Sequence, residues 1–201
     1  MTKIAATVGS RKADTRVLLA SDTSGSMFWP VSGNSKMMCY HIGLLLSMLM
    51  KNRCPQAVTG MFGDIWKTYD MPSENILSNT EKMREHEGEV GYSTNGYEVI
   101  DWLIRKKRVM DKVMLFTDCQ LWNSAGWSYD KHLAKSWDEY KKLAPNAKLF
   151  LFDLVGYGQS PVSMEREDVY CIAGWSDKVF DILAALENGN NAIDEIRRIV
   201  V

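Results

Sequence analysis

The chain has 201 residues, of which 46% are hydrophobic and 24% are charged, a composition typical of a globular protein with a sizeable core. Its formal net charge of −1 argues against a protein that holds nucleic acid through overall positive charge, although it leaves room for a local basic patch. The four cysteines form no Cys-x-x-Cys pair, which favours reduced, buried thiols over a disulfide framework or a zinc cluster.

The sequence has no segment typical of membrane insertion. Its longest apolar run, residues 43–50, is far shorter than the ~20 residues that a membrane-spanning helix needs. The first residues, MTKIAATVGSRKAD, lack the apolar core of a secretory signal. We therefore expect a cytoplasmic protein without a membrane partner.

Short apolar runs alternate with amphipathic stretches along the chain, which predicts strands alternating with helices. In chain order we expect a strand at 17–20, a helix at 34–52 capped by Asn34 or Ser35, strands at 58–62 and 65–69, helices at 73–86 and 96–107, a strand at 112–117, a helix at 129–143, strands at 148–155 and 169–173, and helical stretches at 176–187 and 192–201. The Gly63-Asp64 step favours a tight turn, so the two strands that it joins are expected to be antiparallel.

This order predicts an α/β, Rossmann-like fold with three layers. Crossover helices would cover both faces of a central, mostly parallel sheet, and residues 65–69 would form an antiparallel edge strand. We expect one domain over residues 1–201, with a core of about 14–188 and a C-terminal extension at 189–201. Ligands of such sheets bind beyond the carboxyl ends of the strands, which directs attention to the loops after residues 17–20 and 112–117.

Oxygen-bearing side chains are concentrated in those loops. Asp22, Ser24 and Ser26 are spaced by two after the first strand, and Gly25 lets the backbone turn between the serines. Asp118 directly follows the strand predicted at 112–117. Thr94 lies in the loop before the helix predicted at 96–107. Two carboxylates with several hydroxyls are ligands that suit a hard divalent cation such as Mg²⁺. The alternative interpretation is that these side chains only cap helices.

The combination Asp22-x-Ser24-x-Ser26, Thr94 and Asp118 resembles the metal-ion-dependent adhesion site of von Willebrand factor A domains. The resemblance implies that Ser24, Ser26 and Thr94 bind the ion directly, whereas Asp22 and Asp118 bind it directly or through water. It also implies that an acidic residue of a partner completes the metal shell, and Mg²⁺ or Mn²⁺ is expected in preference to Ca²⁺.

Further segments are similar to the C-terminal A-domain of Ro (TROVE) ribonucleoproteins. These are the strand end LFTDCQ at 115–120, the loop YSTN at 92–95 and the stretch EYKK at 139–142 followed by AKL at 147–149. In that family the A-domain is joined to a ring of RNA-binding helical repeats, which this chain does not contain. The resemblance therefore implies a metal-dependent module that binds a protein partner, either within a Ro-like ribonucleoprotein system or derived from one.

Aromatic residues accompany the predicted site. Phe28, Trp29, Trp122 and Trp127 fall in the two flanking loops, where they would form either a rim that binds the partner or a satellite of the core.

Two other functions are weighed against the binding module. Direct RNA binding by Ro descent would need a basic surface, for which the run 105–108 is a candidate unless it only complements the end of a helix. A Mg²⁺-dependent phosphohydrolase of the haloacid dehalogenase type would need an acid where Ser24 stands. A serine-hydrolase elbow and a phosphate-binding P-loop motif are both absent from the sequence, so we do not expect an enzyme.

Overall fold

The computed structural model describes residues 15–121, 132–158, 160–163 and 165–175. Residues 15–174 form one compact unit. Within the described residues, six strands make one sheet in the order β3-β2-β1-β4-β5-β6. They are β1 (Val17–Asp22), β2 (Val58–Phe62), β3 (Trp66–Thr68), β4 (Lys112–Thr117), β5 (Lys148–Asp153) and β6 (Val169–Ala173). Neighbouring strands are parallel except for β2 and β3, so the predicted antiparallel edge strand is confirmed.

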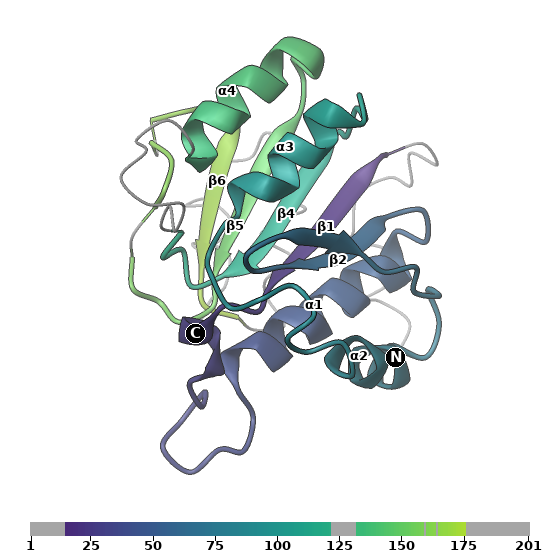
Figure 1. Ribbon diagram of the computed structural model, residues 1–201, viewed down its shortest axis with the longest axis vertical. Coiled ribbons are helices and arrows are strands. Elements are labelled where there is room, and N and C mark those ends of the chain that lie inside the picture. The colour runs from purple at the N-terminus through teal and green to yellow at the C-terminus, as the bar shows by residue number, and fades with distance from the viewer. Residues whose placement is uncertain (1–14, 122–131, 159, 164, 176–201) are drawn as a thin grey trace, which may run out of the picture. The chain divides into compact units, whose positions relative to one another are not determined.

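Helices cover both faces of the sheet, which confirms the predicted three layers (Figure 1). The helices are α1 (Cys39–Arg53), α2 (Ile76–Arg84), α3 (Tyr97–Arg105) and α4 (Leu133–Leu143), with a short 3₁₀ helix η2 (Gly25–Phe28). Gly43 of α1 approaches Phe116, whereas the adjacent Leu115 belongs to the apolar cluster under α3 and α4. Because successive side chains of a strand point to opposite faces, α1 and the α3–α4 pair lie on opposite sides of the sheet.

The strand order reverses between β1 and β4. From β1 the chain passes through α1 to β2 on one side, and it later returns through α3 to β4 on the other side. A crevice forms at such a switch point, beyond the carboxyl ends of the two strands. The fold therefore predicts a binding site at the position where Asp22 ends β1 and Asp118 follows β4.

The start of α1 differs from the predicted helix at 34–52. Residues 29–38 instead form a short antiparallel arm, in which Pro30 bridges Met38 and the Val31 N–H donates to the Met37 carbonyl (2.9 Å). The Met38 N–H donates to Nδ1 of His41 (3.0 Å), so the helix begins at Cys39 and neither Asn34 nor Ser35 caps it. Cross-arm hydrogen bonds that the periodicity does not reveal have displaced the first turn of the predicted helix.

Other predicted elements agree with the structure to within a few residues where they can be compared. The strands at 58–62, 112–117 and 169–173 have the predicted bounds. The predicted helix at 129–143 is seen from Leu133, while the stretches 176–187 and 192–201 lie outside the described residues. No helix in the described part of the chain has the length and apolarity to cross a membrane.

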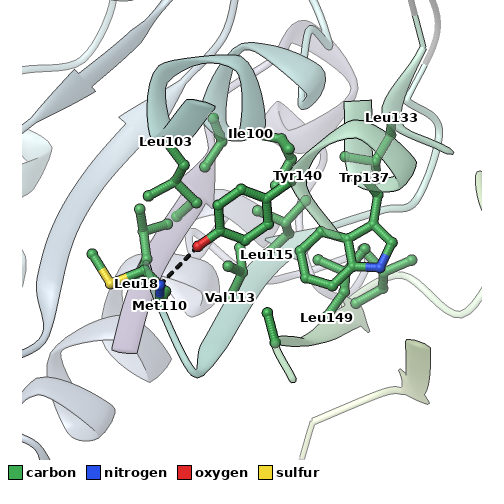
Figure 2. Close-up of a cluster of buried hydrophobic side chains, with 14 of the residues drawn as sticks. Leu18, Ile100, Leu103, Met110, Val113, Leu115, Leu133, Trp137, Tyr140 and Leu149 are labelled. Carbon is green, nitrogen blue, oxygen red and sulfur yellow. Dashed lines mark hydrogen bonds between the residues drawn. The ribbon is translucent and has the colours of Figure 1, made fainter. Parts of the chain in front are cut away.

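Figure 2 shows the core between the sheet and the α3–α4 pair. Trp137 and Tyr140 of α4 are fully buried there against Leu115 and Leu149 of the central strands. The Tyr140 hydroxyl accepts a hydrogen bond from the Met110 N–H (2.7 Å) and donates one to the Arg108 carbonyl (3.1 Å). One buried phenol thus satisfies two backbone groups of the turn that leads into β4.

Replacing this hydroxyl tests its contribution to stability. Tyr140→Phe leaves the Met110 N–H without its partner, and we expect a decrease of about 1–3 kcal/mol in the free energy of unfolding, measured with urea. Tyr157→Phe is the control, because Tyr157 is 50% exposed. Equal stability of Tyr140→Phe and wild type would contradict the role of this hydrogen bond.

Candidate metal centre

The loop after β1 folds as the spacing of its polar residues predicts. Asp22 is fully buried, and its Oδ1 accepts a hydrogen bond from the Ser24 N–H (2.8 Å). This bond turns the chain so that the Ser24 and Ser26 hydroxyl oxygens come within 3.2 Å of each other. The three residues of the Asp-x-Ser-x-Ser motif therefore direct oxygen atoms to one place at the edge of the sheet.

The strand β4 brings a second carboxylate to the same edge. Asp118 is fully buried, and its Oδ1 accepts a hydrogen bond from the Gln120 N–H (3.0 Å). Its Oδ2 is buried and has no hydrogen-bond partner among the described residues. A buried carboxylate oxygen without a donor is costly unless a cation or another ligand reaches it. This orphaned atom is the strongest local sign of a cation site.

Thr117 links the Asp22 carboxylate to the turn that carries Asp118, although the sequence did not single it out. Its hydroxyl donates to Oδ2 of Asp22 (2.6 Å) across the β1–β4 pair and accepts from the Cys119 N–H (3.1 Å). Thr117 directly precedes Asp118 in the sequence, so one side chain fixes both the Asp22 carboxylate and the turn that carries Asp118.

The loop that carries Thr94 lies against the serine motif. The Gly25 N–H, between the two serines, donates to the Tyr92 carbonyl (2.8 Å). Thr94 itself is partly buried, and Asn95 behind it is buried. The structure thus brings together the loops of all five predicted metal ligands: Asp22, Ser24, Ser26, Thr94 and Asp118.

The electrostatics of this cluster favour a bound cation. Burial raises the pKa of Asp22 to about 7, against hydrogen bonds from Thr117 and Ser24 that lower it, and the nearby Asp118 raises it further. The described residues contain no group of three or more His, Cys, Asp or Glu side chains that could hold a metal. Two carboxylates and several hydroxyls remain, a donor set that fits Mg²⁺ or Mn²⁺ and not a soft metal.

The predicted aromatic residues have different environments. Phe28 is partly buried and stacks on Tyr40 (4.6 Å between ring centroids), with Tyr92 edge-on to it (5.5 Å). Trp29 is 67% exposed, and Tyr92, which the sequence did not indicate, is 54% exposed. Trp122 and Trp127 lie outside the described residues. Phe28 therefore supports the loop, whereas Trp29 and Tyr92 present apolar surface beside the cluster.

The raised pKa of Asp22 predicts how the metal-free protein responds to pH. Between about pH 4 and pH 7 the folded protein holds a proton that the unfolded chain has released, so stability falls as pH rises through this window and levels off above it. We expect Asp22→Asn to remove this slope in urea unfolding measured in EDTA. A variant with the same slope as wild type would show that another group titrates.

The fold is shared with known proteins. Residues 16–186 match a family described as the Ro60 vWA domain, where vWA denotes von Willebrand factor A. The fold is similar to that of the Ro (RSR) protein of Deinococcus radiodurans, with a TM-score of 0.67 and 22% identity over 89% of this chain and 35% of that one. The chain thus spans about a third of the length of the Deinococcus protein.

A second solved structure has the same architecture. The conserved hypothetical protein BatB from Bacteroides thetaiotaomicron aligns with a TM-score of 0.54 and 12% identity, over 87% of this chain and 98% of that one. Both identities are low, so these likenesses concern the fold alone. No curated protein matches the chain.

Proposed function

The chain belongs to the family of Ro60 von Willebrand factor A domains, and from this membership we propose that it is a non-catalytic, divalent-cation-dependent binding module. Mg²⁺ or Mn²⁺, in preference to Ca²⁺, would be held by Ser24, Ser26 and Thr94 directly and by Asp22 and Asp118 directly or through water. An acidic group of a protein partner would complete the shell. The setting would be a Ro-like ribonucleoprotein system in the cytoplasm, or one derived from it.

The observation that carries the proposal is the unpartnered Oδ2 of Asp118. Every other carboxylate oxygen of the pair accepts a hydrogen bond, from Ser24, Thr117 or Gln120. A cation at this atom would satisfy it and would offset the repulsion between the two buried carboxylates. Neutral hydroxyls in the rest of the shell would add little negative charge, so the ion would still attract a carboxylate of the partner.

Apolar surface beside the ion would contribute the rest of the binding energy. Trp29 and Tyr92 are exposed next to the serine motif, and the ring of Phe28 supports Tyr92 edge-on. Exposed aromatic side chains next to a charged site are typical of protein interfaces. Trp122 and Trp127, which follow Asp118, remain part of the proposed rim.

Calorimetry with Mg²⁺ and Mn²⁺ tests the cation site. We expect the wild type to bind either ion, and Asp118→Ala and Ser26→Ala to weaken binding by at least about 10–100-fold, the range known for supporting residues of metal sites. Asp70→Ala is the control, because it removes an exposed acid outside the cluster. If the folded wild type binds neither ion, even with millimolar glutamate present to complete the shell, the proposed function is wrong.

A second candidate function is direct RNA binding. Basic residues at the amino edge of the sheet, where the parallel strands begin, favour it. At the start of β1, β4 and β5, the sheet aligns Val17, Lys112 and Lys148 as neighbours. Arg16 directly precedes Val17. Arg108 lies in the turn before β4, and its guanidinium lies over Trp102 (5.4 Å). The Lys148 ammonium lies over Tyr170 (5.3 Å). We name the residues Arg16, Lys107, Arg108, Lys112 and Lys148 the basic edge.

Phosphate binding depends on clustered cations, and aromatic rings beside them allow bases to stack. Asp111, which directly precedes Lys112, is paired with Arg16 (2.9 Å). A chain with a near-neutral net charge can still carry such a local group of basic side chains.

Fluorescence anisotropy with a single-stranded RNA oligonucleotide tests this candidate. Lys107→Glu with Arg108→Glu should weaken binding and reduce the slope of log K against log salt by about 0.7 for each phosphate that the variant no longer neutralises. Lys36→Glu, an exposed change on the arm at the other edge, should not alter it. Binding that requires Mg²⁺, or that the double variant leaves unchanged, would contradict RNA binding at the basic edge.

A further inference from the structure

The turn between β2 and β3 is tied to the loop that carries Thr94. The Asp64 and Ile65 N–H groups both donate to the Val90 carbonyl (2.7 and 3.2 Å), and the Asn95 N–H donates to the Gly63 carbonyl (3.0 Å). These bonds join segments that are far apart in the sequence. They fix the two ends of the loop at 91–95 to one tight turn.

Asp64 adds contacts that reach inside the loop. Its Oδ1 accepts a hydrogen bond from the Ser93 N–H (2.9 Å), and its backbone carbonyl accepts one from Nδ2 of Asn95 (3.1 Å). Donation by the Ser93 hydroxyl and amide lowers the pKa of the Asp64 carboxyl, so the carboxylate is ionised at neutral pH. The residues on either side of Thr94 are thus both held by Asp64.

Two glycines allow this close approach. Gly91 has a φ of +76°, and a Cβ there would overlap the carboxylate of Asp64. A Cβ on Gly63 would overlap the Gly91 carbonyl oxygen. The Asp64 carboxylate therefore occupies the space that a side chain at position 91 would need, and the loop can pack on the turn only because both positions lack one.

We infer that Asp64 is a positioning residue for the cation site: it holds the loop of Thr94 in the place from which Tyr92 supports the serine motif. The inference rests on the proposed cation site. The Tyr92 carbonyl accepts a hydrogen bond from the Gly25 N–H (2.8 Å). A fixed 91–95 loop therefore also holds in place the backbone between Ser24 and Ser26, two more of the proposed ligands. Asp64 is exposed, and it bonds to the residues that flank Thr94, so it acts through the loop.

Mn²⁺ calorimetry on three variants separates positioning from charge. Asp64→Ala removes the acceptor of the Ser93 N–H, and we expect Mn²⁺ binding to weaken about 10-fold or more, as for other supporting residues of metal sites. Asp64→Asn keeps an oxygen that can accept the same N–H, so its affinity should stay within about threefold of the wild type. Asp70→Ala, an exposed acid beyond the other end of β3, should bind Mn²⁺ as the wild type does.

Amide hydrogen exchange gives a second measurement that needs no metal. Asp64→Ala should speed exchange at the Ser93 and Gly25 N–H groups, while Asp64→Asn and Asp70→Ala should not, and all variants should unfold at the same temperature within a few degrees. Unchanged exchange at Gly25 in Asp64→Ala would overturn the inference, whether or not Mn²⁺ binds. Equally weakened Mn²⁺ binding in Asp64→Asn and Asp64→Ala would overturn it too, because charge and not position would then matter.

The two hypotheses fail in different ways. A wild type that binds no Mn²⁺, even with glutamate, removes the proposed function and with it the role of Asp64 at a cation. A wild type that binds Mn²⁺ only as tightly as Asp64→Ala does leaves the cation site intact and removes only the positioning role.

Discussion

The parallel pairing of β1 with β4 brings the two buried carboxylates of the candidate metal centre together at the carboxyl edge of the sheet. Ser21 lies beside Phe116 in the register, so Asp22 and Asp118 emerge next to each other where the two strands end. Both strands are almost completely buried, because helices cover the sheet on both faces. The carboxylates are therefore brought together in a place with little water, where burial and the nearby Asp118 raise the pKa of Asp22.

The next strand shows that a buried aspartate at this edge does not by itself imply a cation. Asp153 ends β5, pairs with Thr117 in the register and is also fully buried. Its carboxylate accepts hydrogen bonds from the N–H groups of Val155, Gly156 and Gly158 (3.3, 2.8 and 2.9 Å). Backbone donors satisfy Asp153, whereas one oxygen of Asp118 has no donor among the described residues. A buried aspartate at this edge is therefore structural where backbone N–H groups satisfy its carboxylate, and it is a candidate metal ligand where one of its oxygens has no donor.

The sequence predicted the parts of this arrangement that depend on local pattern. The run KVMLFT predicted the bounds of β4, and the spacing of Asp22, Ser24 and Ser26 predicted a loop that gathers their oxygens. Thr117 and Asp64 could not be found in this way. Their partners are 95 and 29 residues away in the chain, so their roles exist only once the strands have paired. The predicted start of α1 was wrong for a different, local reason, because hydrogen bonds across residues 29–38 hold that segment as an arm before the helix.

The charge of the two edges follows in part from the direction of the helices. Each crossover helix runs from the carboxyl edge of the sheet to the amino edge, so its negative end lies where the strands begin. Basic residues in the last turns of α1, α3 and α4 complement that dipole; they are Lys51, Arg53, Arg105, Lys141 and Lys142. Arg16, Lys112 and Lys148 lie before or at the start of strands and have no such explanation. Together with Lys107 and Arg108 in the turn before β4, these three residues are the reason to treat the amino edge as a surface separate from the oxygen cluster at the other edge.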